Sequence, residues 1–332
     1  MTHTHVRRPV PPMAALLVIA ALALALPVPA RAQEGAFDRT LTVTGPVDLD
    51  VQSGSGRIRV EPGAAGAVRI SAKLKADNWL PGADVEQRLR QIEQNPPIEQ
   101  QGNVIRVGHF ADMNLPRNIS ISYDITVPAE TKLSASTGSG SVAVGAIAGP
   151  ATLRSGSGSV TAGKITKAVT VATGSGSINL DGAGSLDASA GSGSIHAAGV
   201  AGPVSAKAGS GSVTVTQTEK GDVSVSTGSG GIRLQGVNGA ARVSSGSGGI
   251  TIDGRPAGPW QVHVASGGIT LAVPPDAAFD LDAHSNSGDI DSAIPVTMTV
   301  SGTIDKHRVQ GKVRGGGPLV QLSAASGNIR IR

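Results

Sequence analysis

The sequence predicts an all-β fold: a single-stranded parallel β-solenoid with coils of about 18 residues and one short excursion that contains a helix. Three observations support this prediction. A Gly-Ser phrase recurs at near-constant spacing, Val and Ile alternate on both sides of it, and the 332 residues include 46 Gly but only 3 Phe, 2 Trp and 1 Tyr. Such a composition suits a narrow, repetitive core rather than a conventional globular one.

Residues 1–32 have the pattern of a secretory signal peptide. Arg7 and Arg8 precede an apolar run from Met13 to Leu26, and small residues end the segment at Ala32. This run of 14 residues is shorter than the roughly 20 that span a bilayer. We therefore expect cleavage after Ala32, no transmembrane anchor in the mature chain, and a bacterial protein exported to the periplasm, the cell surface or the medium.

The charge and cysteine content exclude several classes. The sequence has 28 Lys+Arg and 24 Asp+Glu, but removing Arg7, Arg8 and Arg31 with the signal leaves 25 cations against 24 anions. A nearly neutral chain lacks the basic surface that nucleic-acid binding requires, so no nucleic-acid partner is expected. The chain has no Cys, which excludes disulfides, thiolate metal sites and a lipidated cysteine.

Residues 33–135 are predicted to form the N-terminal part of the solenoid, interrupted by an insertion. A helix is expected near residues 84–94, where Val85, Leu89 and Ile92 share one face and two prolines follow. The expected role of the insertion is to cover the open end of the stack. A ligand-binding lobe is the alternative.

Residues 136–332 are predicted to form the regular coils. The apolar residue that ends each Gly-Ser phrase recurs at steps of 18, 18, 17, 18, 19, 18, 19 and 21 residues, and a last step of 39 is about two periods. Alternation such as Val223, Val225, a turn, Ile232 and Leu234 is typical of strands with one inward face. The phrase ends at Ile58, Val142, Val160, Ile178, Ile195, Val213, Ile232, Ile250, Ile269, Ile290 and Ile329.

Glycines mark the predicted turn of each coil. A tight corner repeated in register needs either positive φ or close backbone approach, and Gly allows both. The serines between them could form hydrogen-bonding ladders. The predicted structural turn residues are Gly138, Gly140, Gly156, Gly158, Gly174, Gly176, Gly191, Gly193, Gly209, Gly211, Gly228, Gly230, Gly246 and Gly248. At the far end of the stack, we expect Arg330 and Arg332 of the final strand to act as charged gatekeepers.

One segment has enough ionisable residues to be considered as a reactive face. Strands around Leu281 would place three of these residues on one outward side, where they could seat an acid/base pair or a cation. A solvated face is the simpler interpretation, and no catalytic residue, metal ligand or cofactor is predicted. The candidate face comprises Asp280, Asp282, His284, Asp289 and Asp291.

The remaining functional side chains are isolated from one another. His196 and His263 are predicted to be exposed singletons rather than ligands. Residues 124–259 contain no aromatic side chain on which a sugar could stack, which leaves Trp79 and Trp260 for such a role. Trp260 follows Gly258-Pro259 and is interpreted as a corner plug.

Two segments and the repeat itself resemble a known family. They are SYDITVPAETKLSASTGSGSV at Ser122–Val142, VPPDAAFDLDAHSNSGDI at Val273–Ile290, and the recurrent [ST]-G-S-G-[SG]-[IV] coils. Together they resemble the bacterial DUF4097 adhesin-like β-strand-repeat family over roughly residues 38–332. The resemblance implies a secreted or envelope-associated β-solenoid with an adhesive role, and it implies no catalytic residues. The turns here carry Ser or Gly where such repeats often place Asp, so no regular metal-binding ladder is expected.

The sequence thus predicts a noncatalytic interaction protein with a Ser/Thr/Gly-rich surface. Its expected partner is a component of the cell envelope or cell surface, or another copy of itself. Two alternatives remain open: a glycan-active enzyme that uses the Asp280–Asp291 face, and a periplasmic scaffold of the envelope-stress type.

Overall fold

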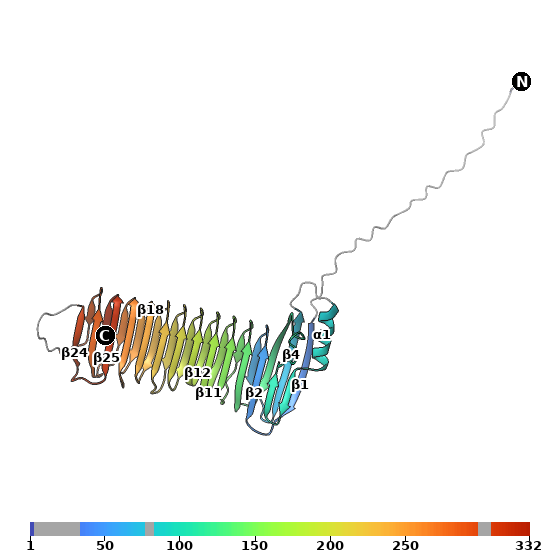
Figure 1. Ribbon diagram of the computed structural model, residues 1–332, viewed down its shortest axis with the longest axis horizontal. Helices are drawn as coiled ribbons and strands as arrows, with labels where there is room; N and C mark the ends of the chain where they lie inside the picture. Colours follow the sequence, from blue (N-terminus) through green and yellow to red (C-terminus); the bar gives the residue numbers. More distant parts are fainter. Residues whose placement is uncertain (3–33, 77–82, 298–306) are drawn as a thin grey trace. The chain divides into compact units, whose positions relative to one another are not determined.

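The predicted β-solenoid is confirmed. The computed structural model describes residues 1–2, 34–76, 83–297 and 307–332, and within these ranges every element is a strand except the helix α1 (Ala83–Gln94). Each regular coil adds one strand to each of two ladders, and the Gly-Ser phrase forms the corner between them. Figure 1 shows the resulting stack, with α1 beside one end.

The first ladder contains the strands that precede the Gly-Ser corner. In spatial order they are β5 (Ile98–Gln101), β6 (Val104–Val107), β2 (Val47–Ser53), β8 (Thr131–Thr137), β10 (Ala151–Ser155), β11 (Val160–Thr173), β12 (Ile178–Ala190), β14 (Val204–Ala208), β16 (Val223–Thr227), β18 (Ala241–Ser247), β20 (Trp260–Ser266), β25 (Leu319–Ser326), β22 (Phe279–Ser285) and β24 (Arg308–Val313).

The second ladder contains the strands that follow the corner. In the same direction they are β1 (Glu34–Thr42), β4 (Ala67–Ala76), β7 (Ile119–Val127), β3 (Ile58–Pro62), β9 (Val142–Val144), β11, β12, β13 (Ile195–Val200), β15 (Val213–Gln217), β17 (Ile232–Val237), β19 (Ile250–Gly254), β21 (Ile269–Ala272), β26 (Ile329–Ile331) and β23 (Ile290–Ser292). The long strands β11 and β12 bend and contribute to both ladders.

The register places residues at equivalent positions of successive coils side by side. Val171 pairs with Ala188, and Ala188 pairs with Ala206, so each inward side chain lies over the corresponding side chain of the next coil. These side chains are buried and form one continuous core. A single coil could not bury its apolar residues alone, so stacking provides both the core and the backbone hydrogen bonds.

The first coil in the sequence is not the first coil of the stack. Strand β2 pairs with β6 on one side and β8 on the other, and β3 lies between β7 and β9. The chain therefore runs outward after β3, builds the end of the stack, and returns past the first coil to start β8. This end finishes in antiparallel pairs, with β1 on β4 and β5 on β6.

Helix α1 packs beside the edge strand β1. Its apolar face, formed by Val85, Leu89 and Ile92, is buried in the core. From the same helix, the Glu93 carboxylate accepts a hydrogen bond of 2.8 Å from the backbone N–H of Ala36 in β1. A carboxylate that engages an edge N–H blocks the pairing of a further strand there.

The opposite end corrects the expectation for the final strand. Strand β25 lies between β20 and β22, and β26 lies between β21 and β23. Arg330 and Arg332 therefore sit in an inner coil and not at the end of the stack. The outermost strands of this end, among the described residues, are β23 and the antiparallel strand β24, whose partner is β22.

Candidate interaction surface

The corner glycines are required by close backbone approach between coils. A Cβ atom built on Gly158 would lie 2.0 Å from the carbonyl oxygen of Gly140, and one on Gly176 would lie 2.1 Å from that of Gly158. The predicted turn glycines up to Gly246 have no positive φ, whereas Gly248 has a φ of 152°. Close approach is thus the main constraint at this corner, and positive φ is confined to a few coils.

A row of buried hydroxyl groups supports the same corner. Thr173 Oγ1 donates to the Gly158 carbonyl at 3.0 Å and accepts from the Gly176 N–H at 3.1 Å, which links two coils. Ser155 makes the corresponding pair of bonds to Gly140 and Gly158. These hydroxyls are therefore part of the core and are not available to a ligand.

Thr173→Val tests this row of hydroxyl groups, because valine keeps the shape of threonine but leaves the Gly158 carbonyl and the Gly176 N–H without their partner. Ala190 occupies the next register position, so the row of hydroxyl groups already contains a gap. We expect a loss of about 1 kcal/mol in the free energy of unfolding, measured by urea denaturation. Thr170→Val, at an exposed position of the same strand, is the control and should be neutral. Equal effects of the two changes would refute the stabilising role of the buried hydroxyl groups.

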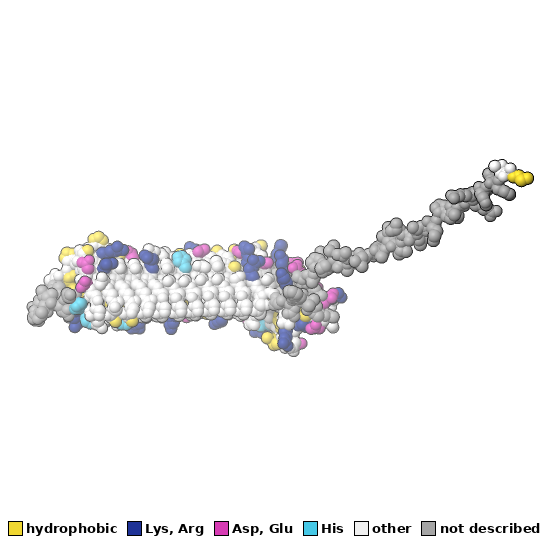
Figure 2. Space-filling model, turned by 90° about the horizontal axis from the view of Figure 1, so that it is seen from above, with side chains coloured by type: hydrophobic (Ala, Val, Ile, Leu, Met, Phe, Trp, Pro, Cys, Tyr) yellow, Lys and Arg dark blue, Asp and Glu magenta, His cyan; other side chains and the backbone are white. Residues whose placement is uncertain are grey.

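The exposed side of the corner carries only small side chains. The serine between the two glycines is exposed in each regular coil, as at Ser157, Ser175 and Ser192. Figure 2, seen from above the strand ends, shows a long band of the stack with neither hydrophobic nor charged side chains. This band is flat and hydroxyl-bearing.

The structure divides the candidate Asp/His face between the two ladders. Asp280, Asp282 and His284 alternate with buried residues of β22 and share its outward side. Asp291 belongs to β23 of the other ladder, and Asp289 precedes that strand. The five residues therefore do not converge.

Two carboxylates of this face are matched with cations of the edge strand. The Arg308 Nη2 atom lies 3.5 Å from Asp282 Oδ1, and the Lys312 Nζ atom lies 4.0 Å from Asp280 Oδ1. Both cations belong to β24, which pairs antiparallel with β22. Within the described ranges, no group of three or more His, Asp or Glu side chains is placed to hold a metal ion.

The two histidines and two tryptophans singled out from the sequence have different surroundings. His196 and His263 are exposed on different ladders, and His263 lines a shallow pocket together with Asp282 and His284. Trp260 is 0% exposed, and its indole N–H donates to the Gly239 carbonyl at 2.8 Å, so it fills the core and offers no stacking surface. Trp79 lies outside the described residues, as does the predicted signal segment apart from its first two residues.

A groove lies on the outward side of the first ladder in the regular coils. It runs across the strands from β11 to β20 and has a volume of about 640 Å³. Five steps between coils of about 4.8 Å give it a length of roughly 24 Å. Its lining includes Thr170, Ser185, Ser205 and Ser224, together with Pro203 and Pro259.

Few charged side chains line the groove, and two of them already form hydrogen bonds within the protein. Asp187, Asp222 and Arg242 line it. Asp222 accepts a hydrogen bond of 2.9 Å from the backbone of Ala240, and the Arg242 guanidinium donates twice to Gln261. The groove is thus a mixed apolar and hydroxyl-rich channel without a strong charge.

Sequence reasoning did not identify this groove. Its lining repeats a small hydroxyl-bearing residue from strand to strand, as at Ser185, Ser205 and Ser224. Their shared consequence, a channel along the stack, depends on the register between coils.

These features define a β-solenoid whose regular coils carry a groove along the stack and a neutral Gly-Ser corner. The chain belongs to the DUF4097 family, as the Toastrack DUF4097 model matches residues 47–332. None of the curated proteins matches the chain. No helix in the described part of the chain is long and apolar enough to cross a membrane.

Three solved structures are similar to this chain at low identity. A "putative cell adhesion protein" from Clostridium sporogenes has 12% identity and a TM-score of 0.24, with 89% of this chain and 98% of that chain covered. A "putative adhesin" from Bacteroides fragilis has 13% identity and a TM-score of 0.27, with coverage of 92% and 99%. One from Parabacteroides distasonis has 14% identity and a TM-score of 0.29, with coverage of 90% and 97%.

Proposed function

We propose that the protein is an exported, noncatalytic solenoid that binds an extended polymer of the cell envelope or cell surface along its groove. The groove itself is the observation that supports this function. It follows the stack over six coils, and its length of roughly 24 Å suits several units of a linear polymer rather than one small molecule. The signal-like residues 1–32 favour export.

The wall chemistry favours an uncharged or weakly charged polymer. Hydroxyl groups such as those of Ser205 and Ser224 can hydrogen-bond a glycan, while Pro203 and Pro259 offer apolar contact. A shallow polar site of this kind gains little from each contact, since water competes for the same hydrogen bonds. Affinity would therefore come from many weak contacts along the groove.

Filling the groove tests the proposal. Ser205→Trp places a large side chain in the groove from β14, whereas Thr214→Trp places the same side chain on the outward side of β15 in the other ladder. We expect the purified protein to cosediment saturably with envelope fragments, and Ser205→Trp to weaken this binding by roughly tenfold. Thr214→Trp should bind normally.

Three outcomes would count against this function. One is the absence of saturable binding to envelope or surface fractions. Another is equal binding by both tryptophan variants, which would move the site away from the groove. Concentration-dependent self-association that Ser205→Trp abolishes would assign the groove to a second copy of the chain.

A further inference from the structure

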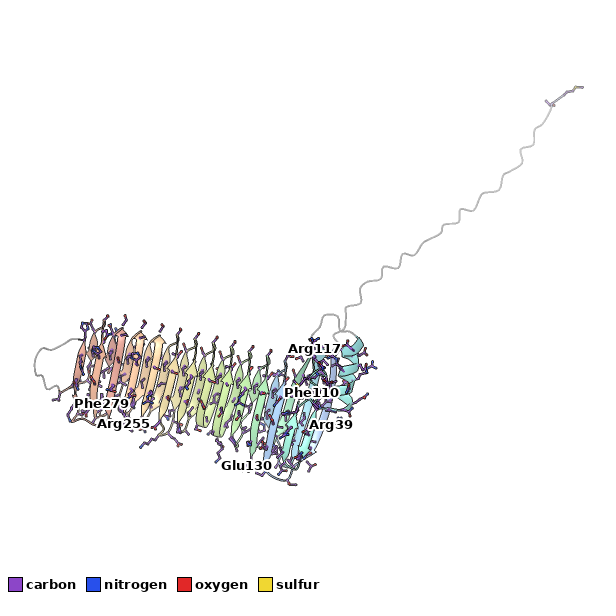
Figure 3. All side chains as sticks on the ribbon, in the orientation of Figure 1. Arg39, Phe110, Arg117, Glu130, Arg255 and Phe279 are labelled. Carbon is purple, nitrogen blue, oxygen red and sulfur yellow. The ribbon has the colours of Figure 1, made fainter. Side chains whose placement is uncertain are left out.

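A second concave site lies at the end of the stack that α1 covers, away from the groove. In the regular coils a few residues form the Gly-Ser corner. In the outer coil, the connection from β6 to β7 instead takes residues 108–118. This loop lies above the last corner of the stack, Gly54–Gly56, and the two enclose a cavity of about 480 Å³. Figure 3 labels two residues of this loop, Phe110 and Arg117, near α1.

We infer that this cavity binds a small organic acid that combines a carboxylate with an apolar, ring-sized body. The site is independent of the proposed polymer-binding groove, because no residue lines both. Its volume suits a molecule of this size.

The apolar part of the ligand is accounted for by the loop. Phe110, Met113 and Pro116 line the cavity, and Met113 is 76% exposed although it is a large hydrophobic side chain. An exposed methionine beside an aromatic ring is typical of surfaces that adapt to an apolar ligand.

Tyr123 supplies a buried hydrogen-bonding group. It lies on β7 with its ring in the core, edge-on to Phe37 at a centroid distance of 6.5 Å, and it also lines the cavity. Its hydroxyl is buried and makes no hydrogen bond with any residue that the structure describes. Burial raises the pKa of this hydroxyl far above its ordinary value, so the group stays protonated and can donate to an acceptor. An unpaired buried hydroxyl is costly, and a ligand acceptor would relieve that cost.

The guanidinium of Arg117 favours an anion. Arg117 and His109 line the cavity, and no Asp or Glu is among its lining residues. The His109 Nε2 atom lies 3.2 Å from Asp50 Oδ2, without the geometry of a hydrogen bond. Arg117 has no carboxylate partner among the described residues, which leaves its guanidinium available to a ligand carboxylate.

The loop is held in place before any ligand arrives. Arg88 of α1 donates hydrogen bonds to the carbonyls of Asn114 and Arg117, at 3.0 and 2.6 Å. Asp112 accepts from the backbone N–H of Asn114 at 2.9 Å, and Asn118 adopts a left-handed φ of 59°. Such preorganisation reduces the entropy that binding would otherwise cost.

The single tyrosine of the chain makes the test direct. Full-length protein labelled with ¹³C in the tyrosine ring should be titrated with 3-phenylpropionate, which has both features, and with 3-phenylpropanamide and glucuronate, which each lack one. We expect a saturable shift of the Tyr123 signal with phenylpropionate, and binding at least roughly tenfold weaker for the other two.

Variants locate the carboxylate. Arg117→Gln should weaken phenylpropionate binding by roughly tenfold or more in calorimetry. Arg90→Gln removes the same charge from the exposed side of α1 and should have no effect. The inference is overturned if phenylpropionate gives no saturable shift, if the amide or glucuronate binds as tightly, or if Arg117→Gln and Arg90→Gln bind alike.

Discussion

Gly176→Ala is expected to destabilise the protein by about 3 kcal/mol, as overpacking against a rigid neighbour does. The new Cβ would lie 2.1 Å from the Gly158 oxygen and 2.6 Å from the Ser159 nitrogen, both backbone atoms of the preceding coil. Those atoms cannot withdraw freely, because hydrogen bonds such as Ser175 N–H to the Gly156 carbonyl, at 3.2 Å, hold the coils together. Gly176 has no positive φ, so backbone conformation contributes little.

The adjacent serine provides the matched control. Ser175 is exposed between Gly174 and Gly176, and Ser175→Ala should change the free energy of unfolding by less than about 0.5 kcal/mol. Urea denaturation followed by circular dichroism gives both values. Similar stabilities for the two variants would show that the corner can relax, and close approach would no longer explain the repeated glycines.

Removal of residues 319–332 is expected to release the neighbouring end of the stack. The final coil, β25–β26, is the layer that joins β22 and β23 to β20 and β21. Its deletion removes five buried apolar side chains, those of Val320, Leu322, Ala324, Ile329 and Ile331. Their burial contributes a stabilising free energy on the order of 10 kcal/mol. A coil stacked in chain order would instead peel away and leave the rest intact.

Hydrogen exchange measured by mass spectrometry distinguishes the two cases. In the truncated chain, residues 279–292 should lose amide protection, while residues 131–254 keep it, because coils contact only their neighbours. A point variant provides a second measurement if truncation prevents folding. Leu322→Asp places a charge in the core of β25, whereas Gln321→Asp places the same charge on its outward side. The inserted order is refuted if residues 279–292 keep their amide protection in both the truncated chain and the Leu322→Asp variant.

The local features of a coil could be predicted because each depends on neighbouring residues alone. Alternation such as Val223 and Val225 sets which side chains face inward, and one buried face follows from it. The spacing of Val85, Leu89 and Ile92 predicts a helical face, and the structure has a helix there. The Asp280, Asp282 and His284 side chains share an outward face for the same reason.

The order of the coils could not be predicted, and the gatekeeper role of Arg330 and Arg332 was wrong for this reason. Every coil presents nearly the same inward Val, Ile and Leu, so the pattern of one coil fits several neighbours equally well. Only the long gaps in the repeat, between Ile58 and Val142 and between Ile290 and Ile329, mark the two places where order changes. A gap in the spacing does not say on which side the chain returns.

The sequence by itself determined the coil: its length, its two strands, its glycine corner and its all-β class. These follow from the two-residue period of a strand and from the missing Cβ of glycine, which are properties of short segments. Tertiary structure decided the insertion of both end coils, the groove across six strands, and the cavity beneath residues 108–118. Each of these depends on which coil lies beside which, and that is settled by packing and backbone pairing between segments far apart in the chain.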